Sequence, residues 1–330
     1  MIKNKRVLVT GGSGFIGSHL CSELLKHKNK VMILNRGMNG NTRLLIKKGA
    51  LFIQGDVTDR ASVDKAMKNV DIVFHLAAAF TNYKKQENYY WNVNVSGTKN
   101  VLDAAVDHKV KRFVNCTTAG VLGHVEQLPA NENTPYNPCD IYERTKMESE
   151  KLGMRYHQEK GLPLTTIRPS GIYGPGDKRH LLLFKTIQKG VFPFIGKRNK
   201  IRDMCYVDDL VRALILAAEK KEAVGKIYIV SNEQVTIEKL AKSIARIMGA
   251  KPIYVTIPVG PVVFIATIIE KVSKLLGISP PLFRRRIGFF TEQRYVDSSK
   301  IRKELGYKPR INYETGLKKT YEWYKKQGWL

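Results

Sequence analysis

The stretch TGGSGFIGSHL (10–20) decides the fold. It follows directly on the apolar run RVLVT (6–10) and leads into an amphipathic pattern from Phe15 to His27. Glycines spaced G-x-x-G-x-x-G at such a strand-to-helix junction permit a tight turn, close approach of the backbone to a pyrophosphate, and close helix–strand packing. The N-terminus of the helix adds free N–H groups and the positive end of its dipole. We therefore predict a dinucleotide-binding site comprising Gly11, Gly14, Phe15, Ile16 and Gly17.

Short β-branched runs alternate with amphipathic stretches through the first half of the chain, which predicts a doubly wound parallel sheet of α/β class. The predicted strands are 6–10, 31–34, 51–54, 71–76, 112–116 and 164–168, and the predicted helices are 15–27, 61–68, 93–108, 141–159, 209–220 and 236–248. Beyond about Arg168 the pattern loosens into a smaller mixed α/β region. We expect a dinucleotide-binding domain over 1–169, to which 202–232 returns, and a substrate-binding region formed by 170–201 and 233–330.

Composition narrows the class of protein. The chain has 330 residues, 43% of them hydrophobic, which is enough for a large core. Its four cysteines form no CxxC pair and suggest neither disulfides nor a metal site, and no apolar leader precedes the first strand, so we expect a cytoplasmic protein. The net charge is +27, yet the basic residues are spread along the whole chain without a nucleic-acid module, so we expect no nucleic-acid partner.

The second predicted strand ends in MILNRG (32–37), where an acidic residue would bind a free ribose 2′-hydroxyl and an arginine would suit a 2′-phosphate. Asn35 and Arg36 stand there without an acid, which favours NADP over NAD; the alternative is that Arg36 stacks on adenine or points to solvent. After the third strand, Asp56 and Val57 are candidates for contact with the adenine. A structural turn is the competing role for Asp56.

Tyr142 and Lys146 stand four residues apart in DIYERTKM (140–147), a spacing that puts both side chains on one helical face. On spacing alone, the alternative to a catalytic role is a pair of side chains on the protein surface. The surrounding motifs argue otherwise, because they occur in a fixed order along nearly the whole chain: TGGSGFIG (10–17), GDV (55–57), HLAA (75–78), NVNVSGTKN (92–100), NCTTAGVLG (115–123), YERTK (142–146), IRPSGIYGPGD (167–177), RDMCYVDDL (202–210) and LGYKPRINYETGLKKTYEWY (305–324).

This series resembles the extended short-chain dehydrogenase/reductases, whose Rossmann-type fold and nicotinamide cofactor are thereby implied. By position, Tyr142 and Lys146 match the catalytic pair, Thr118 matches the catalytic Ser/Thr, and Thr117 is the reserve candidate. Asn94 matches the residue that kinks a helix and holds a water, with a simple polar helix residue as the alternative. Further cofactor contacts are expected at Leu76, Ala77, Ala78 and Pro169.

The implied reaction is hydride transfer between a secondary alcohol carbon and the nicotinamide. Tyr142 would act as the acid or base, although a phenol of pKa about 10 is a poor base at neutral pH. The ammonium of Lys146 would favour the phenolate, and Lys146 would also bind the nicotinamide ribose. Thr118 would hydrogen-bond the substrate oxygen.

The stretch RPSGIYGPGD (168–177) lacks the asparagine that nucleotide-sugar enzymes of this family place after the strand, and it looks more like the sterol and 3β-hydroxysteroid dehydrogenase branch. Arg202, in contrast, matches a phosphate-binding position of the nucleotide-sugar enzymes and favours a nucleotide-sugar substrate. We expect substrate contacts from Thr117, Ser170, Tyr173 and Arg202, with a nucleotide-sugar 4-epimerase or dehydratase as the alternative function. A catalytically idle cofactor-sensing or nucleic-acid-binding protein is a third hypothesis.

Residues 253–269 carry no charge, and Pro261 suits the first turn of a helix running to about Leu276. We expect an apolar flap with a peripheral membrane-surface contact through 261–288; the alternative is an ordinary helix buried against the core. The resemblance also implies a homodimer through 93–108 and 141–159.

Overall fold

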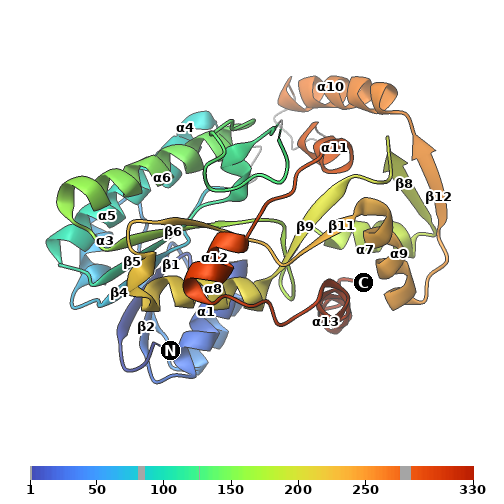
Figure 1. Ribbon diagram of the computed structural model, residues 1–330. Helices are drawn as coiled ribbons and strands as arrows, with labels where there is room; N and C mark the ends of the chain where they lie inside the picture. The colour runs from blue at the N-terminus through green and yellow to red at the C-terminus, as the bar shows by residue number, and fades with distance from the viewer. Residues whose placement is uncertain (1, 81–85, 126, 276–283) are drawn as a thin grey trace.

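The computed structural model describes residues 2–80, 86–125, 127–275 and 284–330. Within them, a seven-stranded, wholly parallel sheet has the order β10-β6-β5-β4-β1-β2-β3 (Figure 1). Its strands are β1 (Arg6–Thr10), β2 (Lys30–Asn35), β3 (Leu51–Gln54), β4 (Ile72–His75), β5 (Arg112–Cys116), β6 (Leu164–Pro169) and β10 (Ile227–Val230). All six predicted strands are present, and the predicted doubly wound sheet is confirmed.

Helices cover both faces of this sheet, which explains why its central strands are apolar without alternation. On one face lie α1 (Phe15–Leu25), α2 (Gly40–Lys47), α8 (Val207–Glu219) and α12 (Ser299–Leu305), and on the other α3 (Arg60–Met67), α4 (Glu87–Trp91), the π-helical turn η1 (Asn92–Ser96), α5 (Gly97–Asp107) and α6 (Ile141–Lys160). The short 3₁₀ turns η2 (Ala119–Leu122) and η3 (Lys221–Ala223) follow β5 and α8. One apolar core fills each side of the sheet.

The second half of the chain builds a smaller mixed region beside the sheet (Figure 1). It contains a three-stranded sheet of β7 (Ile172–Tyr173), β9 (Ile201–Tyr206) and β11 (Glu233–Thr236), and a strand pair of β8 (Val191–Ile195) with β12 (Ile253–Ile257). Its helices are α7 (Leu181–Gln188), α9 (Ile237–Met248), α10 (Val259–Leu275), α11 (Arg284–Thr291) and α13 (Tyr313–Lys326). The side chain of Thr236 accepts the backbone N–H of Lys239 at 3.2 Å and caps α9, as its sequence position indicates.

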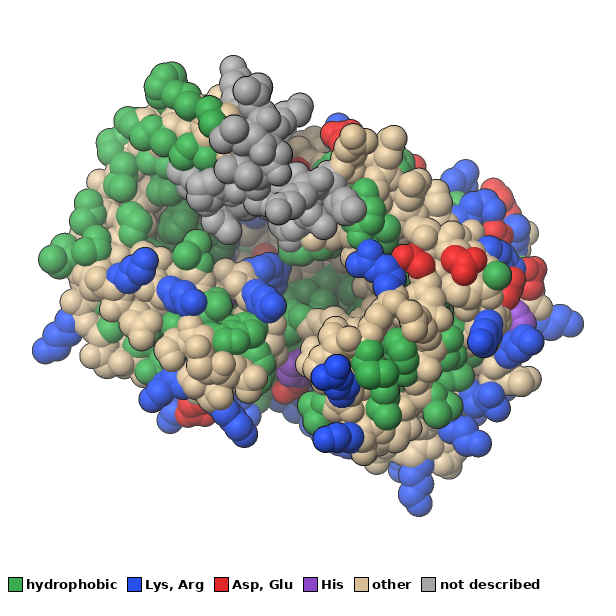
Figure 2. All heavy atoms as spheres, turned by 180° about the vertical axis from the view of Figure 1, so that it is seen from behind, with side chains coloured by type: hydrophobic (Ala, Val, Ile, Leu, Met, Phe, Trp, Pro, Cys, Tyr) green, Lys and Arg blue, Asp and Glu red, His purple; other side chains and the backbone are tan. Residues whose placement is uncertain are grey.

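Helix α10 lies along one outer edge of the smaller region (Figure 1). Its side chains Phe264, Ile265, Ile268 and Val272 are between 47% and 68% exposed, whereas Ala266 faces inward and is fully buried. Figure 2 shows hydrophobic side chains gathered at this corner of the molecule. One face of α10 packs on Ile195 and Ile287 and the other is exposed, so both the apolar flap and the ordinary packed helix stay open, while positions 276–283 of the predicted contact lie outside the described residues. Among the described helices, none has the length and apolar character to cross a bilayer.

Candidate active site

The glycine-rich turn between β1 and α1 is closely packed, and the contact distances explain why glycines occur at this spacing in the sequence. Gly11 has φ +71°, and a Cβ there would lie 2.8 Å from the backbone N of Ala77. A Cβ on Gly17 would lie 2.3 Å from the carbonyl oxygen of Gly11. Gly14 is the N-cap of α1, with the Gly11 oxygen as the neighbour that a Cβ would meet, at 3.2 Å. The turn thus requires glycine at Gly11 and Gly17 and leaves little room for a Cβ at Gly14.

The N-terminus of α1 suits an anionic group. Among the described residues no side chain caps this helix, so the backbone N–H groups of Phe15 and Ile16 remain available for an anion. A helix N-terminus with free N–H groups and no nearby acid attracts phosphate. The residues present therefore fit the pyrophosphate of a dinucleotide, with Gly14, Phe15 and Ile16 as the groups that would hold it.

Beyond β2, polar side chains fix the turn from the other side. Asn35, with its amide oriented to satisfy both partners, accepts the backbone N–H of Ser13 at 3.1 Å and its hydroxyl at 2.7 Å. Asn39 Nδ2 donates to Ser13 Oγ at 3.2 Å. Arg36 is exposed and its guanidinium donates to the Tyr89 hydroxyl at 2.9 Å. Asn35 therefore shapes the phosphate turn, and Arg36 lies exposed just beyond the end of β2.

After β3, Asp56 forms a turn: its Oδ1 accepts the backbone N–H of Thr58 at 2.9 Å. The sequence offered two roles for Asp56, a structural turn and a contact with adenine, and this hydrogen bond is the structural one. The side chain of Val57 is buried against Gly97, where a Cβ would lie 2.7 Å from it.

The segment after β4 lines the opposite wall of the turn. The backbone N–H groups of Leu76 and Ala77 donate to the carbonyl and the hydroxyl of Thr10, at 3.1 and 3.3 Å. Thr10 also contacts Nδ1 of the fully buried His75 at 2.8 Å. Ala78 follows and is exposed. These contacts tie the expected cofactor wall to the end of β1.

Asn94 lies in the π-helical turn η1 and is 1% exposed. Its Oδ1 accepts the backbone N–H of Ala79 at 2.7 Å, and its Nδ2 donates to the Ala79 carbonyl at 3.1 Å and to Thr145 Oγ1 at 2.9 Å. The amide thus ties the loop after β4 to α6. It is more than a simple polar helix residue, because every amide proton is used in holding the site together.

The predicted pair stands on the first turns of α6, which begins at the capping residue Asp140. The ring of Tyr142 packs edge-on against Phe80 at 4.7 Å between centroids. Lys146 is 2% exposed, and its Nζ donates to the carbonyl of Cys116 at 2.7 Å. Burial lowers the pKa of Lys146 below the ordinary lysine value, an effect that the negative charge of Glu150 opposes. Lys146 is therefore a buried cation beside the end of β5, rather than half of a surface pair.

One helical turn beyond Lys146, Glu150 is fully buried and forms an ion pair with Arg168 of β6 at 2.5 Å. The same carboxylate accepts the hydroxyls of Thr117 and Tyr136, both at 2.7 Å. The Thr117 side chain is therefore committed to this network, whereas Thr118 is half-buried at the start of η2, where its Oγ1 accepts the Gly120 N–H at 3.0 Å. Thr118 is the better placed of the two to meet a substrate.

The predicted substrate residues beyond β6 are not all brought to the site. Pro169 ends β6, and the buried Ser170 hydroxyl has no hydrogen-bond partner among the described residues. Tyr173 is 1% exposed in the core of the smaller region, and its hydroxyl donates to the Tyr313 carbonyl at 3.2 Å. The predicted contact of Tyr173 with substrate is therefore wrong, because the side chain serves core packing.

Arg202 is 8% exposed and its guanidinium is occupied by backbone carbonyls. It donates to the carbonyls of Gly288 at 2.7 Å and Phe289 at 2.8 Å, both within α11, and to that of its neighbour Ile201 at 3.1 Å. The side chain thus fastens α11 to β9, and the prediction that it is presented to substrate is not supported by these contacts.

Three residues beside the site were missed by the sequence prediction: His75, Phe80 and Glu150. His75 lies within the HLAA motif, and burial lowers its pKa to about 3, which keeps the imidazole neutral. Glu150 continues the four-residue spacing of Tyr142 and Lys146, and that periodicity is the signal that would have found it.

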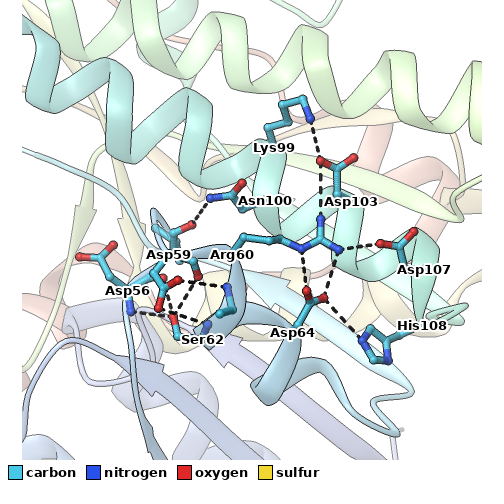
Figure 3. A network of polar contacts seen from close by, with 12 residues as sticks. Asp56, Asp59, Arg60, Ser62, Asp64, Lys99, Asn100, Asp103, Asp107 and His108 are labelled. Atoms are coloured by element: carbon cyan, nitrogen blue, oxygen red, sulfur yellow. Dashed lines mark hydrogen bonds and ion pairs between the residues drawn. The ribbon is translucent and has the colours of Figure 1, made fainter.

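Behind the site, an ion-pair network joins the helices of one face (Figure 3). The guanidinium of Arg60 in α3 contacts the carboxylates of Asp64, Asp103 and Asp107, at 2.9, 3.6 and 2.6 Å. Asp103 of α5 also accepts the hydroxyl of Tyr156 in α6 at 2.6 Å. The network therefore links α3, α5 and α6, the last of which carries Tyr142 and Lys146.

Comparison with known proteins agrees with this geometry. The family described as NAD dependent epimerase/dehydratase matches residues 7–231. The short-chain dehydrogenase/reductase family 42E member 1 of Danio rerio is 31% identical over 99% of this chain and 89% of its own length. The sterol-4-alpha-carboxylate 3-dehydrogenase, decarboxylating, of Candida albicans is 29% identical over 96% of this chain and 97% of that protein. The crystal structure of DesIV, a dTDP-glucose 4,6-dehydratase from Streptomyces venezuelae with NAD and TYD bound, superposes with a TM-score of 0.81 at 26% identity over 98% of both chains.

Proposed function

The chain belongs to the NAD dependent epimerase/dehydratase family of nicotinamide-dinucleotide enzymes, and on that premise we propose that it interconverts a secondary alcohol and a ketone on an apolar, sterol-like substrate. The observation that carries the proposal is the state of Arg202, whose donors are taken by the carbonyls of Gly288, Phe289 and Ile201. An arginine so engaged offers little to a substrate diphosphate. The similarity to a sterol-4-alpha-carboxylate 3-dehydrogenase supports the same choice.

The proton chemistry follows from Tyr142, Lys146 and Thr118. The bound nicotinamide supplies a hydride acceptor or donor for the substrate carbon. Tyr142 takes the proton of the substrate hydroxyl during oxidation and returns it during reduction. Lys146, whose Nζ donates to the Cys116 carbonyl, would supply a cation on the same helical face, where a positive charge favours the phenolate. Thr118 donates a hydrogen bond to the same substrate oxygen.

For the cofactor we propose NADP in preference to NAD. Arg36 stands at the end of β2 without an acidic neighbour in MILNRG, and Tyr89 holds its guanidinium at 2.9 Å. The test is the ratio of the dissociation constants of NADPH and NADH in wild type and in Arg36→Ala. A ratio that Arg36→Ala leaves unchanged would contradict the preference, and Arg43→Ala, a nearby arginine on α2, is the control.

A nucleotide-sugar 4-epimerase or dehydratase is the second candidate, favoured by the likeness to a dTDP-glucose 4,6-dehydratase structure. The two reactions differ in redox balance, since epimerisation and dehydration regenerate the cofactor while a dehydrogenase consumes it. Purified protein is screened by thermal shift with NAD, NADP, UDP-sugars and sterol-like alcohols, because a ligand of the native state raises the melting temperature. Turnover is then followed by nicotinamide absorbance. Stabilisation by a UDP-sugar with no net change in absorbance would replace the first proposal by the second.

We also propose that α10 rests on an anionic membrane surface, where an apolar substrate would be met. Four large side chains of this helix are at least 47% exposed, and the chain carries a net charge of +27. Flotation with anionic liposomes tests the contact. Absence of binding at low salt, or equal binding by Phe264→Ser/Ile268→Ser, would contradict it.

A homodimer through α5 and α6 is proposed from the family resemblance. The outer face of α6 carries the exposed cations Arg144, Lys151 and Arg155, so like charges would meet across such a dimer, and salt should strengthen it by screening their repulsion. Sedimentation at low and high ionic strength measures this directly. A protein that sediments as a monomer at both ionic strengths would contradict the proposed dimer.

A further inference from the structure

His19 in α1 faces two acceptors at once. Its Nε2 lies 2.8 Å from the carbonyl oxygen of Pro175, and its Nδ1 lies 2.7 Å from the carboxylate of Asp208 in α8. A carbonyl cannot donate a hydrogen bond, and neither can an ionised carboxylate. Both contacts are hydrogen bonds only when the imidazole carries two protons.

Asp208 is ionised in this arrangement. Burial would raise the pKa of Asp208, but the hydrogen bond and charge of His19 outweigh it, and the pKa lies below the ordinary aspartate value. The other charged groups around the pair are Arg212 on α8, Lys319 on α13 and Glu23 on α1. Arginine, lysine and glutamate keep their charge near neutral pH, so a pH dependence of these contacts that is lost in His19→Gln would come from the imidazole.

The contact to Pro175 fixes a turn that borders the cofactor site. In this turn, residues 174–177, a Cβ on Gly176 would lie 3.3 Å from the ring of Phe15. Phe15 is the first residue of α1, whose N–H groups face the expected pyrophosphate, and its ring also packs edge-on against His19. The turn therefore forms a wall beside the N-terminus of α1.

The same turn leads toward the catalytic pair. Asp177 ends it and accepts the backbone N–H of Arg179 at 2.9 Å. The Arg179 guanidinium lies 6.0 Å from the ring of Phe80, which packs on Tyr142. A shift of the turn would thus be felt at both ends of the active site.

We infer that His19 is a positioning residue for the cofactor: doubly protonated, it holds the turn 174–177 against Phe15, and cofactor binding weakens when it loses a proton. The inference goes beyond the proposed reaction and rests on it in one respect, that a dinucleotide binds at the N-terminus of α1. Loss of the second proton breaks one of the two hydrogen bonds, because a neutral imidazole has a single N–H.

Binding of NADPH and NADH is measured by nicotinamide fluorescence between about pH 6 and pH 8.5, the range in which histidine titrates. In wild type the dissociation constant should rise about fivefold over this range, the size expected for one typical intramolecular hydrogen bond. His19→Gln should remove the pH dependence. His27→Gln is the matched control, because His27 lies just beyond the C-terminal end of α1 and contacts Glu23.

Asp208→Asn distinguishes protonation from packing. Its amide donates to the neutral Nδ1, so the turn stays fixed at high pH and the affinity should no longer fall. Wild-type affinity that is flat with pH, or a slope that persists in His19→Gln, would overturn the inference.

A second measurement needs no cofactor. The melting temperature of His19→Gln should be lower than that of wild type at about pH 6, and the two should converge at about pH 8.5. An equal difference at both pH values would show a purely structural role and overturn the inference. If neither dinucleotide binds at any pH, the cofactor assignment fails, while the melting data still decide the role of His19.

Discussion

Lys146 Nζ donates to the carbonyl of Cys116 at 2.7 Å, in a position where the side chain is 2% exposed. A lysine is seldom buried to this degree without a task, because removing an ammonium from water is costly. The hydrogen bond fixes the cation at the end of β5, on the helical face that also presents Tyr142. Substitutions at both residues test what this placement achieves.

Replacing Tyr142 by phenylalanine should lower turnover by about 10²–10⁴-fold, the usual contribution of a general acid or base. Cofactor affinity should be retained, since the ring remains and only the hydroxyl is lost. Steady-state rates and fluorescence titration measure the two effects. Tyr156→Phe, which removes a hydroxyl from the same helix, should keep full activity. Normal turnover in Tyr142→Phe would withdraw the assignment.

Lys146→Met should weaken cofactor binding and move the pH–rate profile upward by about one to three pH units, because the phenol loses the cation that favours its ionised form. The measurement is kcat/KM as a function of pH. Lys151→Met removes an exposed cation from the same helix and should leave the profile in place. An unshifted profile in Lys146→Met would mean that the lysine acts only on the cofactor or on packing.

Gly17→Ala should lower the free energy of unfolding by about 1–3 kcal/mol or more, as expected for overpacking, since its Cβ would lie 2.3 Å from the Gly11 oxygen. Urea denaturation gives the value. On α2, a Cβ added to Gly40 would meet no atom within 4 Å, so Gly40→Ala should be neutral or slightly stabilising. Equal effects of the two substitutions would contradict the close packing of the turn.

Glu150→Gln should cost about 3–5 kcal/mol of stability, because it leaves the buried Arg168 without its counter-charge. The double substitution Glu150→Met/Arg168→Met should be more stable than the single one, since it removes both charges from the interior. Denaturation curves of the three proteins decide the matter. A single variant as stable as wild type would mean that Arg168 finds another partner.

Asp203 should make stability fall as pH rises. It is 8% exposed, and burial raises its pKa to about 7 in spite of hydrogen bonds from Ser231 and the Val296 N–H. Between the unfolded value of about 3.9 and this higher one, the folded state holds a proton that the unfolded state has lost, so stability decreases across this window by at most about 4 kcal/mol. Melting temperatures from about pH 5 to pH 8 measure the slope over most of that window.

Asp203→Asn should flatten this slope, while Asp107→Asn, at a side chain that is 62% exposed, should not. Stability that rises between pH 5 and pH 7 in wild type but not in Asp203→Asn would reverse the sign and contradict the prediction.

Much of the fold could be predicted because the strands of a parallel sheet are recognisable as apolar runs. RVLVT, RFVNC and LTTIR all became buried strands, and TGGSGFIGSHL became the turn and helix that the glycine spacing indicates. The resemblance to the extended short-chain dehydrogenase/reductases, with its sterol-dehydrogenase-like branch, is confirmed by the family match and the relatives.

What the sequence could not supply depends on contacts between distant segments. Tyr173 looks like a site residue because it stands beside Ser170 in the chain, yet its side chain points into a core built by α13 and β9. Arg202 matches a phosphate-binding position, but the carbonyls that occupy it come from residues 288 and 289. No local pattern reports a partner that lies 86 residues further along.

The π-helical turn around Asn94 has a consequence for chain length. A π turn bonds residues five apart where an α-helix bonds residues four apart, so Asn92–Ser96 accommodates one residue more than a regular helix would. The wider turn takes up the extra residue, which in a regular α-helix would rotate everything downstream by about 100° about the helix axis. Deleting Val95 should therefore remove the wide turn in which Asn94 holds the backbone of Ala79. The helix therefore contains one residue more than a regular helix of the same span. In a sequence alignment with a regular helix that residue would look like an insertion, although the site needs it to place Asn94.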